Sequence, residues 1–422
     1  MAVSKKRKAK IVSNDSHLPI TSGNGGVCFP LGFKASYGKA GVRQSRKPDV
    51  ALILCDKLSS VGLTTTTNNI KAWCVLSNAE KVKKSPYIRA LICTAGNANC
   101  CNGERGKEAD IMLAEDLAED FGCDISEVLT ATTGIIGRTY PIEKVDQALP
   151  EIVARAARSP EYGSGFAGAI MTTDSVPKQC ELEIIIDEKP VRFGGSSKGS
   201  GMIAPNMATM FGFVTTDAKI EPTLLQKTWS EIVDRSFNAM SVDGDTSTND
   251  MGFVIASGES EVKIIADTEN YNLFYEGLLA ISQKLAKLIA RDGEGATKLI
   301  EIRVSGIKQD NKACRKVAKT IAESMLVKTA CFGNDPNWGR ILMAVGRSGV
   351  PIDANSLKVS VAGHLLFDRG EALPFDGNVV SDAMRSEELI IEVEGNLGGE
   401  SSRFWTCDLS YDYVKINAEY TT

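Results

Sequence analysis

Histidine is almost absent from this 422-residue chain, which contains only His17 and His364. His17 lies near the amino terminus, and no motif for nucleophilic catalysis surrounds His364. An imidazole is the usual general base for serine, cysteine and threonine nucleophiles, so a Ser-His-Asp or Cys-His mechanism would depend on His364 alone. The sequence therefore favours another base for any nucleophile. One candidate is a free α-amino group, whose unperturbed pKa of about 7.7 to 8.0 is close to neutral.

Three further features are missing. No segment approaches the roughly 20 apolar residues that a membrane-spanning helix needs. The net charge is only -5, and the charges are mixed in sign, so no nucleic-acid footprint is present. The eleven cysteines form no C-x-x-C pair, and the adjacent Cys100 and Cys101 lack the spaced pairing typical of zinc ligands. We expect no metal, nucleic acid or membrane partner, and a reducing cytoplasmic compartment in preference to an organellar matrix.

The first 25 residues differ in composition from the rest of the chain. Lys5 to Lys10 form a basic cluster, and the following stretch is rich in serine, asparagine and glycine. No apolar segment of the kind found in secretory signals is present. We expect residues 1–25 to be a disordered, solvated tail.

The apolar patterning predicts an α+β fold in which helices cover antiparallel sheets, with two or three modules for a chain of this length. The predicted strands are 51–55, 89–94, 182–186, 252–256, 299–304, 357–361, 389–393, 403–409 and 413–417. The predicted helices lie at 111–121, 222–237, 274–288 and around 341–345. Asp335 and Pro336 are predicted to be the cap and first residue of the last helix.

The most unusual segment is 194–217, which is rich in glycine and serine. It contains neither a phosphate-binding loop nor a dinucleotide fingerprint. Self-cleavage of a chain needs a strained loop, a small residue, a hydroxyl and then a strand that holds the new terminus. Gly199–Pro205, Ala208, Thr209 and residues 210–214 supply these features in that order. From spacing alone, an ordinary junction between a loop and a strand is the favoured explanation of the segment.

A resemblance to a known family favours self-cleavage. Lys198–Met210 closely resembles the cleavage segment of the ornithine acetyltransferase family, also called the glutamate N-acetyltransferase family, of the arginine biosynthesis bifunctional type. Further segments resemble this family and occur in its order: 94–99, 132–137, 169–174, 243–250, 292–298 and 335–342. The resemblance therefore extends over roughly Gly26 to Thr422.

The resemblance implies an activity. Such an enzyme moves an acetyl group from N2-acetyl-L-ornithine to L-glutamate in the cyclic route to arginine, through an acetylated threonine. It implies cleavage between Ala208 and Thr209, with Thr209 as nucleophile and its own amine as base. Thr133 and Gly134 match the positions that stabilise the oxyanion. The positions that match the family's substrate-binding residues are Thr172, Lys198, Thr209, Glu294, Asn417 and Thr422.

The resemblance also implies an architecture. We expect a layered sandwich like that of the N-terminal-nucleophile enzymes, cut into an alpha chain of residues 26–208 and a beta chain of residues 209–422. Two copies of each chain would form a heterotetramer acting on small amino acids. No cofactor is expected, and the use of acetyl-CoA as a second donor stays open. Lys198 is expected to face a substrate carboxylate and Glu294 an ammonium group.

Two other functions stay open. An N-terminal-nucleophile amidase or aminopeptidase would use the same Thr209 but pass the acyl group to water, and an uncut chain would be a non-catalytic scaffold. The chain also departs from the family pattern at 211–213, where Phe-Gly-Phe replaces the common Leu-Ala-Phe, at Asn334 and at Cys100. The first departure is expected to change the shape of the acyl pocket and with it the donor preference.

Overall fold

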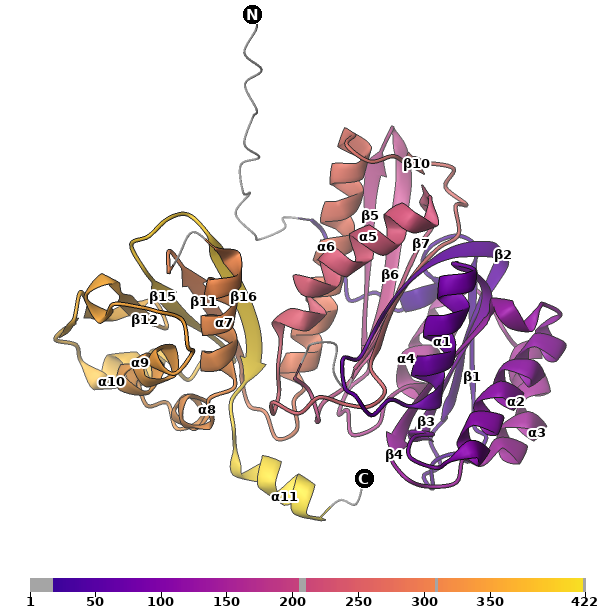
Figure 1. Ribbon diagram of the computed structural model, residues 1–422, viewed down its shortest axis with the longest axis horizontal. Helices are drawn as coiled ribbons and strands as arrows, with labels where there is room; N and C mark the ends of the chain where they lie inside the picture. Colours follow the sequence, from indigo (N-terminus) through magenta and orange to yellow (C-terminus); the bar gives the residue numbers. More distant parts are fainter. Residues whose placement is uncertain (1–17, 205–209, 308–309, 420–422) are drawn as a thin grey trace, which may run out of the picture.

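The computed structural model describes residues 18–204, 210–307 and 310–419. Figure 1 shows a larger lobe built from the first two thirds of the chain and a smaller carboxy-terminal lobe beside it. The predicted nucleophile Thr209, its neighbour Ala208 and the terminal Thr422 lie outside the described residues.

The larger lobe is organised around one eight-stranded sheet of order β4-β3-β2-β9-β7-β6-β5, with β1 also paired to β2. Most pairs are antiparallel, as predicted, but β3 with β4 and β7 with β9 are parallel. The strands are β1 (Phe33–Gly38), β2 (Val50–Thr65), β3 (Tyr87–Asn97), β4 (Val128–Ile135), β5 (Lys178–Ile186), β6 (Lys189–Lys198), β7 (Phe211–Thr216) and β9 (Met251–Ala256). The glycine-rich residues 194–198, which the sequence left unassigned, therefore end strand β6.

Among the described residues of the larger lobe, six α-helices cover this sheet. They are α1 (Trp73–Lys84), α2 (Glu104–Phe121), α3 (Ile142–Ala154), α4 (Pro160–Ala169), α5 (Pro222–Asp234) and α6 (Glu269–Arg291). Helix α6 illustrates how local sequence sets an element. The hydroxyl of Thr268 caps its first turn by accepting from the Tyr271 amide at 3.2 Å. Phe274, Leu278 and Ile281 recur at helical spacing and are fully buried.

Strand alternation divides the core of this lobe into layers. Phe213 of β7 packs against Phe166 of α4 and stacks on Phe253 of β9, whereas its neighbour Val214 belongs to the cluster under α5 and α6. Leu91 of β3 lies in the same cluster as Phe213, so the two halves of the curved sheet face each other across it. A third cluster fills the space under α2 and α3. The predicted α+β layered sandwich is confirmed, while its cleavage into two chains stays a prediction.

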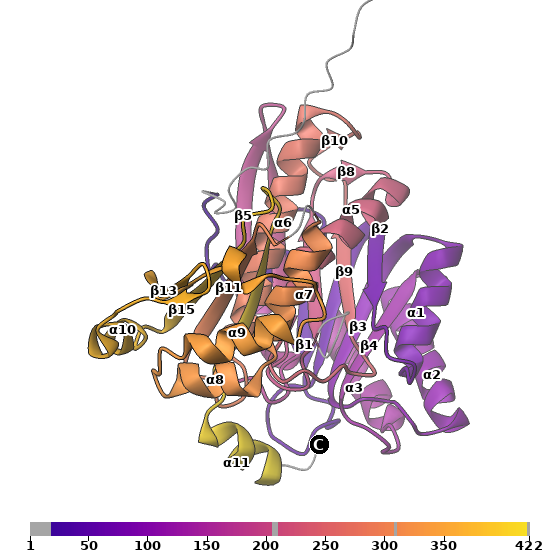
Figure 2. The ribbon, with the colours of Figure 1, turned by 60° about the vertical axis from the view of Figure 1, so that its left-hand side comes forward.

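The smaller lobe contains a six-stranded sheet of order β14-β13-β12-β15-β11-β16. Its strands are β11 (Leu299–Ser305), β12 (Lys358–Val361), β13 (His364–Asp368), β14 (Glu371–Ala372), β15 (Glu388–Glu394) and β16 (Ser401–Cys407). Its helices are α7 (Asn311–Ala322), α8 (Met325–Phe332), α9 (Trp338–Gly346) and α10 (Gly377–Ala383), which come forward in Figure 2. The short strands β8 (Lys219–Ile220) and β10 (Lys263–Ile264) pair in parallel near α5.

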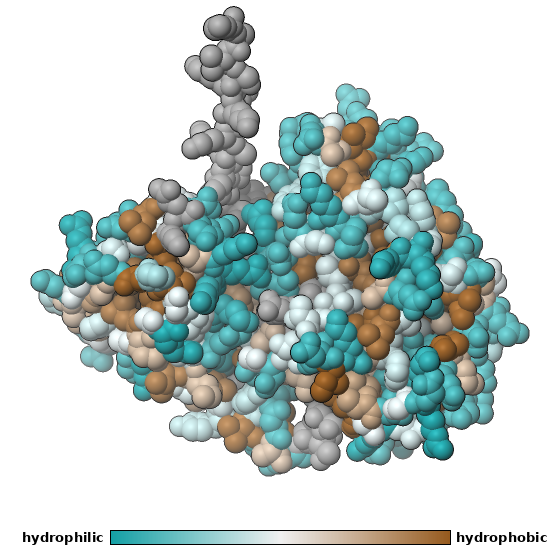
Figure 3. Space-filling view, viewed as in Figure 1, coloured by the Kyte–Doolittle hydropathy of each residue, from teal (hydrophilic) through white to brown (hydrophobic). Residues whose placement is uncertain are grey.

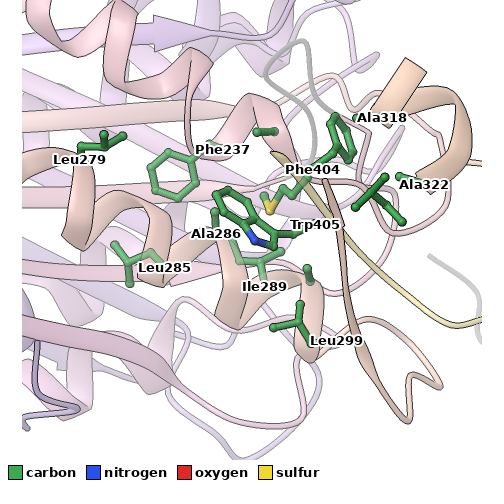
Figure 4. Close-up of a cluster of buried hydrophobic side chains, with 14 of the residues drawn as sticks. Phe237, Leu279, Leu285, Ala286, Ile289, Leu299, Ala318, Ala322, Phe404 and Trp405 are labelled. Carbon is green, nitrogen blue, oxygen red and sulfur yellow. The ribbon is translucent and has the colours of Figure 1, made fainter. Parts of the chain in front are cut away.

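The two lobes share a continuous apolar core. Figure 4 shows Trp405 of β16 among Ala286 and Ile289 of α6. The Lys287 ammonium lies 5.3 Å from the centre of the Trp405 ring, and the Ser241 amide donates to the Trp405 carbonyl at 2.9 Å. Because these contacts bury both surfaces, the smaller lobe is packed firmly against the larger one.

Two local predictions are wrong. Residues 413–417 were predicted as a strand but form helix α11 (Tyr411–Glu419), which lies beyond the end of β16 and buries none of its residues. Its short apolar run fits either element, and no neighbouring strand edge pairs with it. Asp335 does not cap α9, because the cap is Asn337, whose side chain accepts from the Arg340 amide at 3.1 Å.

The molecular surface is predominantly polar. Figure 3 shows hydrophilic side chains over most of one face, with small apolar patches scattered between them. Within residues 18–204, 210–307 and 310–419, no helix combines the length and apolar character required to cross a membrane.

Candidate active site

A cavity of about 150 Å³ lies where separate parts of the fold converge. Strands β3, β4 and β6 reach it with their carboxyl ends, and the segment before β9 and helix α11 complete it. Six of the predicted site residues line it: Thr133, Gly134, Thr172, Lys198, Glu294 and Asn417. They come from five regions of the chain that are far apart in sequence. The fold therefore brings together every predicted site residue that the structure describes.

Lys198, the last residue of β6, is one of the two cationic residues that line the cavity in the described part of the chain. Its side chain is 2% exposed, and its Nζ donates to Oγ1 of Thr133 at 3.1 Å. Burial lowers the pKa of the Lys198 ammonium, and the carboxylates of Asp174 and Asp250 offset part of this effect. A buried cation that faces a cavity suits a carboxylate or a developing oxyanion.

Gly134 lies in β4, where this strand approaches β3 very closely. Its φ of +130° is in a region that favours glycine. A Cβ at this position would lie 2.4 Å from the carbonyl carbon of Gly96. The neighbouring peptide is also fixed, because Nδ2 of Asn249 donates to the carbonyl oxygens of Thr132 and Ala98 at 2.7 and 2.6 Å. This rigid turn can present donors to an oxyanion without reorganisation.

Asp174 lies behind the cavity and binds the backbone next to residues that line it. Its two carboxylate oxygens accept from the amides of Thr172 at 2.8 Å and Gly199 at 2.6 Å. Lys178 donates to the same carboxylate at 2.6 Å. Burial alone would raise the pKa of Asp174, but the charges of Lys178 and Lys198 outweigh it and lower the pKa. An ionised Asp174 thus fixes the backbone at Thr172 and Gly199.

Glu294 and Asn417 form the mouth of the cavity. The Nδ2 of Asn417 in α11 donates to Oε2 of Glu294 at 2.8 Å. The Glu294 amide donates to the carbonyl of Ser200 at 2.8 Å, which ties this loop to the end of β6. Asn417 was expected at the end of a buried strand, but it lies on an exposed helix. The mouth is therefore negative, whereas the interior at Lys198 is positive.

Some cavity residues were missed by the sequence analysis. Arg43 lines the cavity, and its guanidinium donates to the carbonyls of Ala169 and Met171 at 3.0 and 2.5 Å. Nothing in the local sequence marks this arginine, because its partners lie more than 120 residues away. Asn249 and Asp250 stood inside a segment that resembles the family, but no role was predicted for either residue.

The residues that depart from the family pattern do not line the cavity, although the thiol of Cys100 contacts Thr248, which does. Phe211 and Phe213 are buried in the core between the two halves of the sheet, and the described residues that line the cavity include neither. The sulfur atoms of Cys100 and Cys101 are 3.6 Å apart. The described residues hold no cluster of three histidine, cysteine, aspartate or glutamate side chains suited to a metal ion.

Known proteins resemble the chain over nearly its whole length. An arginine biosynthesis bifunctional protein ArgJ from Synechococcus sp. is 44% identical over 409 residues, which cover 94% of this chain and 98% of that protein. Its counterpart from Thermus thermophilus is 43% identical over 397 residues, which cover 94% of this chain and 100% of that protein.

Among solved structures, ArgJ from Bacillus halodurans is 41% identical and covers 49% of this chain and 98% of its own, with a TM-score of 0.48. An ornithine acetyltransferase complexed with ornithine, from Mycobacterium tuberculosis, is 32% identical. The match covers 44% of this chain and 97% of that structure, with a TM-score of 0.41. The profile of the ArgJ family matches residues 34–422. The resemblance seen in the sequence is thereby confirmed, and the chain belongs to the ArgJ family.

Proposed function

We propose that this protein is a self-cleaving acetyltransferase of arginine biosynthesis, which moves acetyl from N2-acetyl-L-ornithine to L-glutamate through an acetyl-Thr209 intermediate. The observation that carries the proposal is the cavity, in which six residues predicted for this chemistry lie together. Close relatives named for arginine biosynthesis support the pathway.

The first half-reaction forms an ester on the enzyme. The Oγ of Thr209 attacks the acetyl carbonyl carbon, and its proton passes to the free α-amine of the same residue. Thr133 and Gly134 stabilise the oxyanion of the tetrahedral intermediate. The carbon–nitrogen bond then breaks, and the departing α-amine of ornithine takes the proton from the Thr209 ammonium.

The second half-reaction returns the enzyme to its starting state. The α-amine of glutamate attacks the acetyl ester, loses one proton to the Thr209 amine and forms N-acetylglutamate. The threonine oxygen leaves with that proton and becomes a hydroxyl again. Because the acetyl group stays on the enzyme between the two substrates, a ping-pong rate law is expected.

The charges of the cavity suit amino-acid substrates. We assign Lys198 to a substrate α-carboxylate and Glu294 to the side-chain ammonium of ornithine, since opposite charges attract most strongly where water is excluded. Thr172, Asn417 and Thr422 complete the proposed binding site. Glutamate lacks that ammonium, so removing the charge of Glu294 should weaken acetylornithine binding more than glutamate binding.

Several finer features belong to the proposal. The relatives are named bifunctional, which supports a second acetyl donor, and we assign this role to acetyl-CoA. The active protein would consist of an alpha chain, residues 26–208, and a beta chain, residues 209–422, assembled as two copies of each in the cytoplasm.

Two measurements test the function. Intact mass should show fragments that meet at Ala208 and Thr209, and Thr209→Ala should leave one full-length chain without transferase activity. A wild-type chain that stays whole would refute the mechanism and favour the scaffold. Purified protein should release ornithine from acetylornithine in proportion to added glutamate. Release that ignores glutamate would identify an amidase instead.

A third assay tests the second donor. Acetyl-CoA replaces acetylornithine, and the product N-acetylglutamate is measured by mass spectrometry. Formation at a rate within about tenfold of the acetylornithine reaction would support bifunctional use. No product above that of Thr209→Ala would restrict the enzyme to acetylornithine.

A further inference from the structure

Cys100 and Cys101 form an adjacent pair of thiols in the loop between β3 and α2, and the proposed mechanism uses neither. In an extended chain, neighbouring side chains point to opposite sides. Here Cys101 has a φ of +57°, and the two sulfur atoms lie 3.6 Å apart. Cys100 is fully buried, whereas Cys101 is exposed. One thiol of the pair is therefore open to reagents in solvent and has the second thiol beside it.

The covalent geometry makes any disulfide between these two residues a reversible one. Adjacent residues joined by a trans peptide have Cα atoms about 3.8 Å apart, while the Cα atoms of ordinary disulfides are about 4.4 to 6.8 Å apart. A disulfide between Cys100 and Cys101 would therefore be strained, and strained, exposed disulfides are the readily reduced ones. An exposed thiol with a second thiol beside it is also the arrangement typical of redox-sensitive cysteines.

The buried member of the pair is connected to the wall of the cavity through side chains. The Cys100 thiol contacts the side chain of Thr248, which lines the cavity. The Thr248 hydroxyl donates to Oδ1 of Asn249 at 2.5 Å. Asn249 in turn binds the carbonyl oxygen that precedes the turn formed by Thr133 and Gly134. The thiol therefore supports the residue that holds the proposed oxyanion donors in place.

Backbone contacts connect the same loop to the cavity. The Gly137 amide donates to the Cys100 carbonyl at 2.9 Å, and the Ala98 amide donates to the Ile135 carbonyl at 3.0 Å. These bonds join the loop to the end of β4, where Gly134 and Ile135 line the cavity. A change in the position of Cys100 is thus transmitted to the cavity by two routes.

We propose that Cys100 and Cys101 are a modification site, at which oxidation closes a reversible disulfide that displaces the turn at Thr133 and Gly134 and slows acetyl transfer. The effect on transfer rests on the proposed function, whereas formation of the disulfide does not. Closing the bond draws the Cys100 sulfur towards Cys101 and removes its proton, so its contact with Thr248 is weakened.

The step balances with hydrogen peroxide as the oxidant. The exposed Cys101 thiolate attacks one peroxide oxygen, the O–O bond breaks, and a sulfenic acid and a hydroxide form. The hydroxide takes up the proton that the Cys101 thiol released. The Cys100 sulfur then attacks the Cys101 sulfur, and the hydroxyl group leaves as water with the Cys100 proton. The two thiols lose two electrons, and the peroxide is reduced to two molecules of water.

The environment of each thiol sets the order of these steps. Burial raises the pKa of the Cys100 thiol, so less of it is ionised at neutral pH. The thiolate is the reactive form of cysteine, and an oxidant in solvent reaches an exposed sulfur first. Cys101 is therefore the thiol that reacts with the oxidant, and Cys100 is the thiol that resolves the sulfenic acid.

Mass spectrometry tests the site itself. The reduced protein is treated with graded hydrogen peroxide, its free thiols are alkylated, and the peptide that contains both cysteines is analysed. We expect this peptide to lose two hydrogen atoms and to take up no alkyl group, at peroxide concentrations that leave the half-buried Cys123 free to be alkylated. Dithiothreitol should restore alkylation of both Cys100 and Cys101.

Activity and amide hydrogen exchange measure the effect on the cavity. In the oxidised protein, kcat/KM for acetylornithine should fall by about tenfold or more, because small displacements of catalytic groups have effects of this size. Amides in residues 132–137 should exchange faster, and dithiothreitol should reverse both changes.

Three variants complete the test. Cys101→Ser should keep the basal rate of the wild type and should resist peroxide, because no disulfide forms. Cys123→Ser removes a cysteine outside the pair and should be as sensitive to peroxide as the wild type. Cys100→Ala removes the buried thiol and should also form no disulfide. It replaces the serine variant as the test if that variant does not fold.

The outcomes separate the modification site from the proposed function. A pair that stays fully alkylated at a peroxide concentration that oxidises Cys123 would refute the site. A complete disulfide with an unchanged transfer rate would refute its coupling to the cavity, as would equal inactivation of Cys101→Ser by peroxide. A reduced wild type without transferase activity would refute the proposed function alone, and the disulfide and the exchange of residues 132–137 would still decide the inference.

Discussion

The ammonium of Lys178 and the carboxylate of Asp292 form a buried ion pair, 2.5 Å apart, between residues that are 114 positions apart in the sequence. The same ammonium lies 2.6 Å from Asp174, whose side chain is fully buried. Lys178 belongs to the proposed alpha chain and Asp292 to the proposed beta chain. If the chain is cut as proposed, this triad links the two resulting chains beside the cavity residue Glu294.

Removing this ammonium should be strongly destabilising. Lys178→Met leaves two buried carboxylates without their partner, and loss of one member of a buried pair commonly costs about 3 to 5 kcal/mol. Urea unfolding should show this loss. Lys84→Met removes an exposed lysine that is paired with Glu80, and it should leave the urea concentration at the unfolding midpoint unchanged. Equal midpoints for the two variants would show that the triad contributes nothing to stability.

Lys198 should be needed for binding and for transfer. Lys198→Met removes a charged donor from Thr133 and from the proposed substrate carboxylate, and such interactions contribute about 1.5 to 3 kcal/mol each. We expect kcat/KM for acetylornithine to fall by at least about tenfold, with a higher KM. Steady-state assays check this prediction, with the exposed Lys107→Met as the control. A variant with wild-type KM for both substrates would exclude Lys198 from carboxylate binding.

Gly134 should tolerate no side chain. Alanine there would combine an unfavourable φ with a contact of 2.4 Å to the Gly96 carbonyl carbon. Either β4 moves away from β3, which displaces the oxyanion donors, or the fold loses stability. We expect Gly134→Ala to lower kcat by about 10²–10³.

Gly168 provides the matched control for this substitution. It lies in α4, and a Cβ there would meet nothing within 4 Å. Gly168→Ala should keep full activity and gain up to about 1 kcal/mol of stability from its better helix propensity. If Gly134→Ala kept both its activity and its melting temperature, the proposed oxyanion site would be wrong.

The sequence predicted elements better than it predicted their arrangement. Buried strands such as β9 and β11 were found because apolar residues repeat with strand spacing. Helix α11 was missed because the run around Val414 and Ile416 is too short to distinguish a strand from a helix. The parallel pairing of β3 with β4 was also missed, since no local pattern determines which strands become neighbours.

In the candidate site, too, individual residues were predicted from the sequence but their arrangement was not. Thr133, Lys198 and Glu294 were found through motifs, but their proximity depends on the curvature of the sheet. Arg43 and Asn249 gave no signal of their own, because their roles depend on contacts with backbone atoms far along the chain. Such roles appear only once the backbone is placed, and a periodic pattern of side chains does not contain them.

Asp116 in α2 should reduce stability at neutral pH. Burial, and to a smaller extent the neighbouring carboxylates of Asp146 and Asp120, together raise the pKa of Asp116 to about 6. Its folded pKa therefore lies above the unfolded value of about 3.9. The folded state binds the proton more tightly, so stability is greatest below the unfolded pKa and falls as the pH rises through the folded pKa.

Asp116→Asn should therefore raise the melting temperature at pH 7.5, where the wild-type carboxylate is ionised. Because Asp116 is partly exposed to solvent, screening limits the gain to roughly 1 kcal/mol or less. The difference should vanish at about pH 3, where the wild-type group is protonated in both the folded and the unfolded state. Thermal unfolding between about pH 3 and pH 8 checks this, with the exposed Glu115→Gln as the control. A pH-independent gain would mean that the asparagine acts through packing, because a charge effect must disappear once the wild-type carboxylate is neutral.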